Sequence, residues 1–142
     1  MKQRDNLLRL KRFRIDALKR QMATLSAMSA DVDRKLLDLE DGIARERQRA
    51  NDSDLGRLAF PSFLRAMDCR RENLRATLKE IGREREQAQL ELARVGEEVQ
   101  ALEVTAEQEI RRAAESQLHK SRMRLQDLAL SRHLRRQTLR QM

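Results

Sequence analysis

Apolar residues recur every seven positions along the first third of the chain. They form two rows, one of Leu8, Ile15, Met22, Leu36 and Ile43 and the other of Leu18, Leu25, Val32 and Leu39. Two rows with this spacing are the a and d positions of a heptad repeat. They predict a helix over about residues 4–50, and its narrow apolar seam needs a partner helix.

The heptads stop near residue 50. The segment Asn51-Asp52-Ser53-Asp54-Leu55-Gly56 is rich in residues that favour turns. The only proline, Pro61, follows shortly afterwards. Because proline suits the first turn of a helix, we expect a turn over about 51–61 and a second helix over about 62–140.

The second helix carries heptads of its own. One row is Phe60, Met67, Leu74, Ile81, Ala88, Val95 and Leu102, and the other is Leu64, Leu78, Leu92, Val99 and Ala106, with Arg71 and Arg85 interrupting it. After Ala106 the apolar phase shifts by about four residues, which is a stutter.

The position of this stutter favours a hairpin. If the chain folds back at 51–61, its first residues lie opposite residues 105–110, where the register changes. We therefore predict an all-α fold, a single domain over 1–142, formed by a long two-helix antiparallel coiled coil whose second helix is longer than the first.

Composition supports this fold and argues against an enzyme. Of the 142 residues, 38% are charged and 2% are aromatic, as in long helices rather than compact domains with pockets. There is no phosphate-binding glycine motif, His119 and His133 are too far apart to share a metal, and Cys69 has no C-x-x-C partner. We expect no catalytic residues, no metal and no cofactor.

The same sequence bears on location. Its longest apolar runs are three residues, too short to span a bilayer, and its charged N-terminus does not resemble a signal peptide. A single cysteine fits a reducing compartment. We expect a cytoplasmic protein without a transmembrane segment.

Charge is concentrated at the two ends of the chain. Net charge is +6 over residues 1–20 and +7 over 111–142, but −5 over 21–110. Both ends also carry apolar residues on two faces, with Leu10 and Phe13 opposite one seam and Leu130 and Leu134 opposite the other. A basic end with two apolar faces favours an acidic protein partner. The alternatives are an ordinary solvated face, self-association, or a fold-back of 110–142 onto the hairpin.

Nucleic acid is a less favoured partner. The apolar seam runs directly through the basic residues Arg9, Lys11, Arg12 and Arg14, and base-stacking aromatics and recognition motifs are missing from the sequence. We expect no specific nucleic-acid binding.

Two segments resemble one branch of the FliJ family of flagellar export proteins. They are Arg4-Asp5-Asn6-Leu7-Leu8-Arg9-Leu10-Lys11-Arg12-Phe13 and Asp54-Leu55-Gly56-Arg57-Leu58-Ala59-Phe60-Pro61-Ser62-Phe63-Leu64-Arg65-Ala66, the latter followed by Arg70-Arg71-Glu72-Asn73-Leu74. The resemblance implies an antiparallel coiled coil similar to the stalk of rotary ATPases. Such a stalk enters the hexameric flagellar export ATPase, promotes its assembly, and links it to the membrane-embedded export gate and to export chaperones.

The basic and apolar pattern at the two ends indicates a tip that could enter such a ring, and the resemblance indicates the surface for the gate or chaperones. A basic tip for the ATPase would include Arg9, Arg12, Phe13, Arg14, Arg132, Leu134 and Arg135. The gate or chaperone surface would include Phe63 and Met67, although Met67 also belongs to a heptad row. The protein would then lie at the cytoplasmic face of the cell membrane, at the flagellar base. Two alternatives are the stalk of a virulence-type III secretion ATPase and a scaffolding coiled coil without an ATPase partner.

Overall fold

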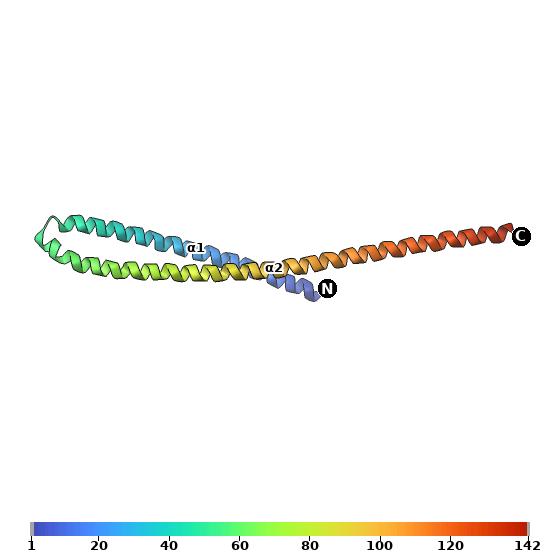
Figure 1. Cartoon of the computed structure of the whole chain (residues 1–142), viewed down its shortest axis with the longest axis horizontal. Coiled ribbons are helices and arrows are strands. Elements are labelled where there is room, and N and C mark those ends of the chain that lie inside the picture. Colours follow the sequence, from blue (N-terminus) through green and yellow to red (C-terminus); the bar gives the residue numbers. More distant parts are fainter. Residues whose placement is uncertain (1, 142) are drawn as a thin grey trace. The chain divides into compact units, whose positions relative to one another are not determined.

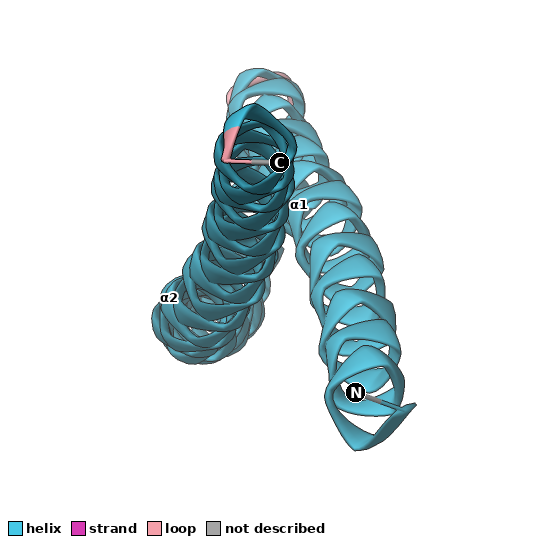
Figure 2. Ribbon diagram, turned by 90° about the vertical axis from the view of Figure 1, so that its right-hand side faces the viewer, coloured by secondary structure: helices cyan, strands magenta, loops and turns pink. Residues whose placement is uncertain are grey.

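The protein consists of two helices joined by a short turn. The computed structural model describes residues 2–141, in which α1 spans Lys2–Ala50 and α2 spans Asp54–Arg140 (Figure 1). That part of the chain contains no strand, and its loops are confined to the turn and the C-terminal end (Figure 2). The predicted all-α fold with a longer second helix is confirmed.

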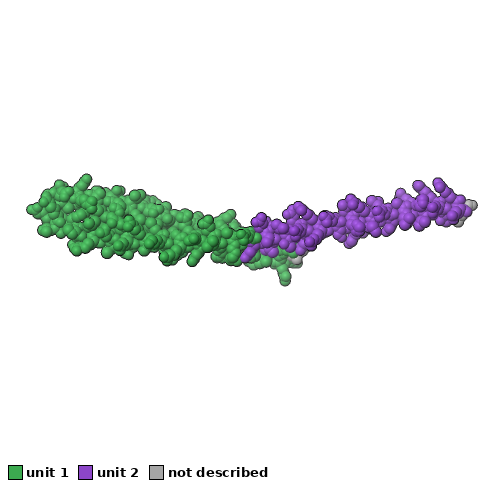
Figure 3. All heavy atoms as spheres, in the orientation of Figure 1, with its two compact units in different colours: residues 1–97 green, residues 98–142 purple. Residues whose placement is uncertain are grey.

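The chain divides into two compact units, which are coloured separately in Figure 3. The first unit, Met1–Glu97, contains all of α1 and the first half of α2, and the second unit is Glu98–Met142. The first unit is an antiparallel helical hairpin (Figure 1).

The order of contacts along the hairpin establishes its direction. Arg71 of α2 pairs with Glu40 of α1, and further along α2, Glu91 pairs with Arg14. Between these two ion pairs lies an apolar cluster of Leu25, Val32 and Ile81, flanked by Leu74 and Leu78. Residue numbers fall along α1 as they rise along α2, so the helices are antiparallel, as predicted.

One heptad row of α1 is buried more deeply than the other. Leu18, Leu25, Val32 and Leu39 are all buried, and Leu18 is the most enclosed at 1% exposed. In the other row only Leu8 and Ile43 are buried, whereas Ile15, Met22 and Leu36 are half-buried. A pair of helices covers only a narrow seam, which leaves the edge of the second row open.

The predicted turn at 51–61 is wrong in its length. The turn occupies only residues 51–53, and α2 begins at Asp54. Ser53 ends the turn, because its Oγ accepts a hydrogen bond from the Gly56 amide at 3.0 Å and its carbonyl accepts one from the Arg57 amide at 3.2 Å. A serine that satisfies the free amides of a first turn is a strong N-cap.

Pro61 does not mark the start of α2 as predicted, but lies inside the helix about two turns further on. It cannot donate a hydrogen bond to the carbonyl of Arg57, and such a loss usually disfavours a helix. Pro61 is on the exposed surface, where water can satisfy that carbonyl. The N-cap at Ser53 therefore decides where the helix begins.

Candidate protein-binding surfaces

The basic residues at the start of α1 form an exposed stripe beside the buried seam. Arg9, Arg12 and Phe13 share one face because they are three and four residues apart, and Phe13 is 67% exposed. They line a shallow hollow together with Leu8, Asp5 and Asp16. The hollow thus combines an exposed aromatic ring with two arginines and two carboxylates.

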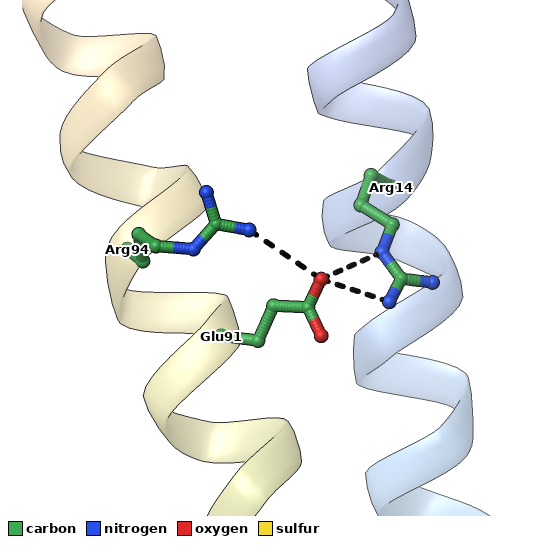
Figure 4. Close-up of polar contacts among 3 residues, drawn as sticks. All are labelled: Arg14, Glu91 and Arg94. Atoms are coloured by element: carbon green, nitrogen blue, oxygen red, sulfur yellow. Dashed lines mark hydrogen bonds and ion pairs between the residues drawn. The ribbon is translucent and has the colours of Figure 1, made fainter.

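Arg14 lies on a different face of α1 and takes part in the hairpin. Its Nη2 lies 2.9 Å from Oε1 of Glu91, and its Nε donates to the same oxygen at 3.3 Å (Figure 4). Nη2 of Arg94 approaches that oxygen to 3.6 Å. The Arg14 side chain is still half exposed, so it joins the two helices and also contributes to the basic surface.

The remaining residues predicted for the basic tip, Arg132, Leu134 and Arg135, lie in the second unit and are exposed. Arg132 and Arg135 are three residues apart and share a face, whereas Leu134 lies on another face with Leu130. The structure therefore places the predicted tip residues in two different units.

The second unit exposes an unusual amount of apolar surface. Every residue from Ile110 to Gln141 is exposed. Eight large apolar side chains in this stretch are at least 47% exposed: Ile110, Leu118, Met123, Leu125, Leu128, Leu130, Leu134 and Leu139. A helix of this kind gains most of its stability from packing against another element.

Phe63 and Met67, predicted to bind the gate or chaperones, are half-buried on α2 in the first unit. The ring of Phe63 lies 6.3 Å from that of Phe60, centroid to centroid, and the guanidinium of Arg47 lies 5.6 Å above Phe60. Both residues line hollows between α1 and α2. Met67 thus belongs to the seam and to the surface at once.

Two features near the turn were missed from the sequence. Leu55 and Leu58 are 78% and 79% exposed. Gly42 lines the same hollows as Phe63 and Met67. The signals were present, because Leu55 and Leu58 fall outside both heptad rows and Gly42 directly precedes Ile43 of the seam. The predicted turn at 51–61 left Leu55 and Leu58 outside any helix, and the place of Gly42 in a hollow depends on the residues of α2 that lie opposite it.

The His, Cys, Asp and Glu side chains of residues 2–141 form no cluster that could hold a metal ion. Cys69 is an exposed thiol, and the Nε2 atom of His133 lies 3.2 Å from that of Gln137, one helical turn away.

The pKa of Arg71 is shifted by its neighbours in the hairpin. Its hydrogen bond to Glu40 raises the pKa of the guanidinium above its ordinary value, and the charge and hydrogen bond of Asp68 add to this effect. The cause is a cross-helix ion pair, so the shift belongs to the packing of the hairpin.

The described helices have no membrane-spanning segment, since neither contains a stretch that is long and apolar enough to cross a bilayer. Comparison with known proteins gives no match to a family model, a curated protein or a solved structure.

Proposed function

We propose that this chain is the coiled-coil stalk of a flagellar export ATPase, a non-enzymatic protein of the FliJ type that enters the hexameric ring and promotes its assembly and activity. The proposal rests on the resemblance of residues 4–13 and 54–66 to that family and on the surface of the two units. It also places the protein at the cytoplasmic face of the membrane, at the flagellar base.

The observation that carries the proposal furthest is the exposure of residues 110–141. This stretch is helical to Arg140 and exposed throughout, and it carries apolar side chains on more than one face. Residues 111–142 have a net charge of +7. A ring lined with acidic and apolar groups would enclose such a helix from all sides, whereas a single flat partner would cover only one face.

The start of α1 would contribute to the same interaction. Arg9 and Arg12 are exposed beside the ring of Phe13, and an exposed aromatic with arginines is a common centre of protein interfaces. Arg14 would act in two ways, as a basic group facing the ATPase and as the partner of Glu91 within the hairpin.

A second contact would be made near the turn. Phe63 and Met67 would contribute to binding of the export gate or of export chaperones, as the family resemblance suggests.

The proposal is tested by ATP hydrolysis. The purified flagellar export ATPase of the same organism is titrated with this protein at low and high salt. We expect saturable stimulation at one chain per hexamer that weakens as salt rises, because screening reduces the attraction between exposed charges. No stimulation at either salt would contradict the proposal and would leave the virulence-type ATPase and a scaffolding role as the remaining possibilities.

Two charge-reversal variants, one of them a control, test whether the basic residues make the ATPase contact. The variant with Arg9, Arg132 and Arg135 changed to Glu should lose most of the stimulation. A matched control with Arg65, Arg75 and Arg83 changed to Glu alters net charge equally on exposed positions of the first unit and should keep it. Equal stimulation by the two variants would exclude the basic residues as the ATPase contact.

A further inference from the structure

A groove follows one side of the hairpin, between α1 and the first part of α2, and lies entirely within the first unit. It consists of three adjoining hollows. The middle hollow shares Gly42 with the first, and it shares Glu46, Arg49 and Phe63 with the hollow nearest the turn. The groove extends from Lys35 of α1 and Arg70 of α2 as far as the turn. The sixteen positions of α1 from Lys35 to Ala50 correspond to roughly 24 Å of helix.

The groove has an apolar floor and an opening at its centre. Leu39, Phe60, Phe63 and Met67 contribute its apolar side chains. Gly42 lies among them, and a Cβ atom built on it would meet nothing within 4 Å. The missing side chain leaves space for an apolar group of a partner between Phe63 and Met67.

Two exposed leucines, Leu55 and Leu58, lie on the first turns of α2 near the turn end of the groove, outside the residues that line it. They are the two most exposed large apolar side chains of the described chain, at 78% and 79%. The shape fits an added helix that packs between α1 and α2, as amphipathic helices do in apolar grooves.

The charged residues that line the groove indicate which charge a bound partner helix would carry. Lys35, Arg45, Arg49 and Arg70 are basic, whereas Asp38 and Glu46 are the acidic residues among those that line the groove. Glu46 already pairs with Arg49 at 3.3 Å. The surplus is positive and therefore attracts an acidic partner. The helix at 111–142 of a second copy, with a net charge of +7, would be repelled.

We propose that this groove binds an acidic amphipathic helix of a partner protein, with apolar side chains at i, i+3 or i+4, and i+7 directed at the opening above Gly42. The inference deepens the gate or chaperone contact in the proposed function and rests on it in that respect, because Phe63 and Met67 form part of the groove. It does not require the ATPase contact.

The test measures binding of a designed peptide to the full chain. The probe is a fluorescently labelled synthetic helix of about 18 residues, with leucines at heptad spacing and glutamates along both flanks. A second probe carries lysines in place of the glutamates. We expect saturable binding of the glutamate peptide, measured by fluorescence anisotropy, and at least tenfold weaker binding of the lysine peptide.

Two glycine variants separate groove binding from general effects. Gly42→Leu fills the opening and should weaken the glutamate peptide at least tenfold. Gly96→Leu is the matched control, because a Cβ there also meets nothing within 4 Å and the residue lies outside the groove. It should bind like the unmodified chain, and circular dichroism should show equal helicity in all three proteins.

A rim variant keeps the proposal testable if Gly42→Leu does not fold. Arg45→Glu with Arg70→Glu should weaken the glutamate peptide and strengthen the lysine peptide, whereas Arg75→Glu with Arg83→Glu should do neither. The proposal is overturned if the glutamate peptide does not bind, if both peptides bind equally, or if Gly42→Leu binds like Gly96→Leu. It is also overturned if sedimentation shows a dimer of this chain that Gly42→Leu abolishes.

The peptide assay contains no ATPase, so it is independent of the stimulation experiment. If the chain binds the glutamate peptide but does not stimulate the ATPase, the proposed stalk function is contradicted and the proposed groove is not. If the chain stimulates the ATPase but does not bind the peptide, only the proposed groove is contradicted.

Discussion

Nε of Arg71 on α2 lies 2.7 Å from Oε1 of Glu40 on α1, and Nη1 of the same side chain lies 2.7 Å from Oδ1 of Asp68. Arg71 occupies a heptad position at which the seam would normally have an apolar residue. The guanidinium lies between carboxylates from both helices, and the Arg71 side chain is only 22% exposed. One arginine thereby contributes to the alignment of α1 against α2.

This alignment can be tested by exchanging the two charges. Arg71→Glu should lower the thermal midpoint, because it places a third carboxylate beside Glu40 and Asp68. Combining it with Glu40→Arg should recover part of the loss, since a cross-helix pair is restored while Asp68 keeps its position. Circular dichroism melts of the unmodified chain, the two single variants and the double variant measure the coupling between Arg71 and Glu40. A double variant no more stable than Arg71→Glu would show that the pair does not set the alignment.

The hairpin core should respond strongly to truncation at Leu18. Leu18 is 1% exposed, and removal of a leucine side chain from such a site costs about 2–5 kcal/mol in free energy of unfolding. Leu37→Ala is the matched control, because Leu37 is 66% exposed on the same helix and should change stability by about 0.5 kcal/mol or less. Urea denaturation of both variants checks the difference, and equal effects would contradict the packing of the seam.

Glycines of α2 should differ in their response to alanine. A Cβ at Gly82 would meet nothing within 4 Å, so Gly82→Ala should stabilise the helix by about 0.5–1 kcal/mol. At Gly56 a Cβ would lie 2.9 Å from Ser53 Oγ and 3.0 Å from Ala50 Cα.

Gly56→Ala should therefore lose that gain and disturb the N-cap of α2. Thermal melts of the two alanine variants distinguish these cases. Stabilisation by Gly56→Ala as large as by Gly82→Ala would show that the turn is looser than the structure indicates.

Arg14 can be tested for its two roles separately. The pair with Glu91 is partly exposed, and such pairs contribute about 0.2–1 kcal/mol. Arg14→Glu should destabilise the hairpin slightly, and the addition of Glu91→Arg should recover part of the loss by reversing the pair, although Arg94 then loses its contact with Glu91.

The reversed pair also tests the ATPase contact. If Arg14 contributes directly, as proposed, the reversed pair should be more stable than Arg14→Glu but should give equally reduced ATPase stimulation. Full stimulation by the reversed pair would assign Arg14 to the hairpin alone. Urea denaturation and ATP hydrolysis of the same protein samples provide both measurements.

Which residues of the candidate surfaces could be foreseen depends on what each one contacts. Exposure of Phe13 and Leu134 follows from their places opposite the heptad rows. The contact of Arg14 with Glu91 did not follow from the sequence, because a turn at 51–61 would place Arg14 opposite a residue about two helical turns further along α2. The short turn at Ser53 brings Arg14 beside Glu91 instead, whereas Arg71 and Glu40 pair at nearly the offset that a turn at 51–61 predicts.

The sequence by itself determined the helices and their antiparallel pairing. Heptads on both sides of a single turn-forming segment allow few other folds, because each seam is too narrow to be buried alone. A heptad repeat is satisfied equally well by any alignment that differs by whole heptads, however. Only the tertiary structure decided the alignment, through the short turn capped by Ser53, which brings Glu91 beside Arg14.

The same distinction applies to Arg85 and Gly42. Both Arg71 and Arg85 interrupt the heptads, but Arg71 is enclosed between two carboxylates whereas Arg85 is exposed. Gly42 became part of a groove because Phe63 and Met67 of the other helix lie beside it. A sequence pattern assigns a residue to a face of its own helix, but its environment depends on which residues of the partner helix come to lie opposite.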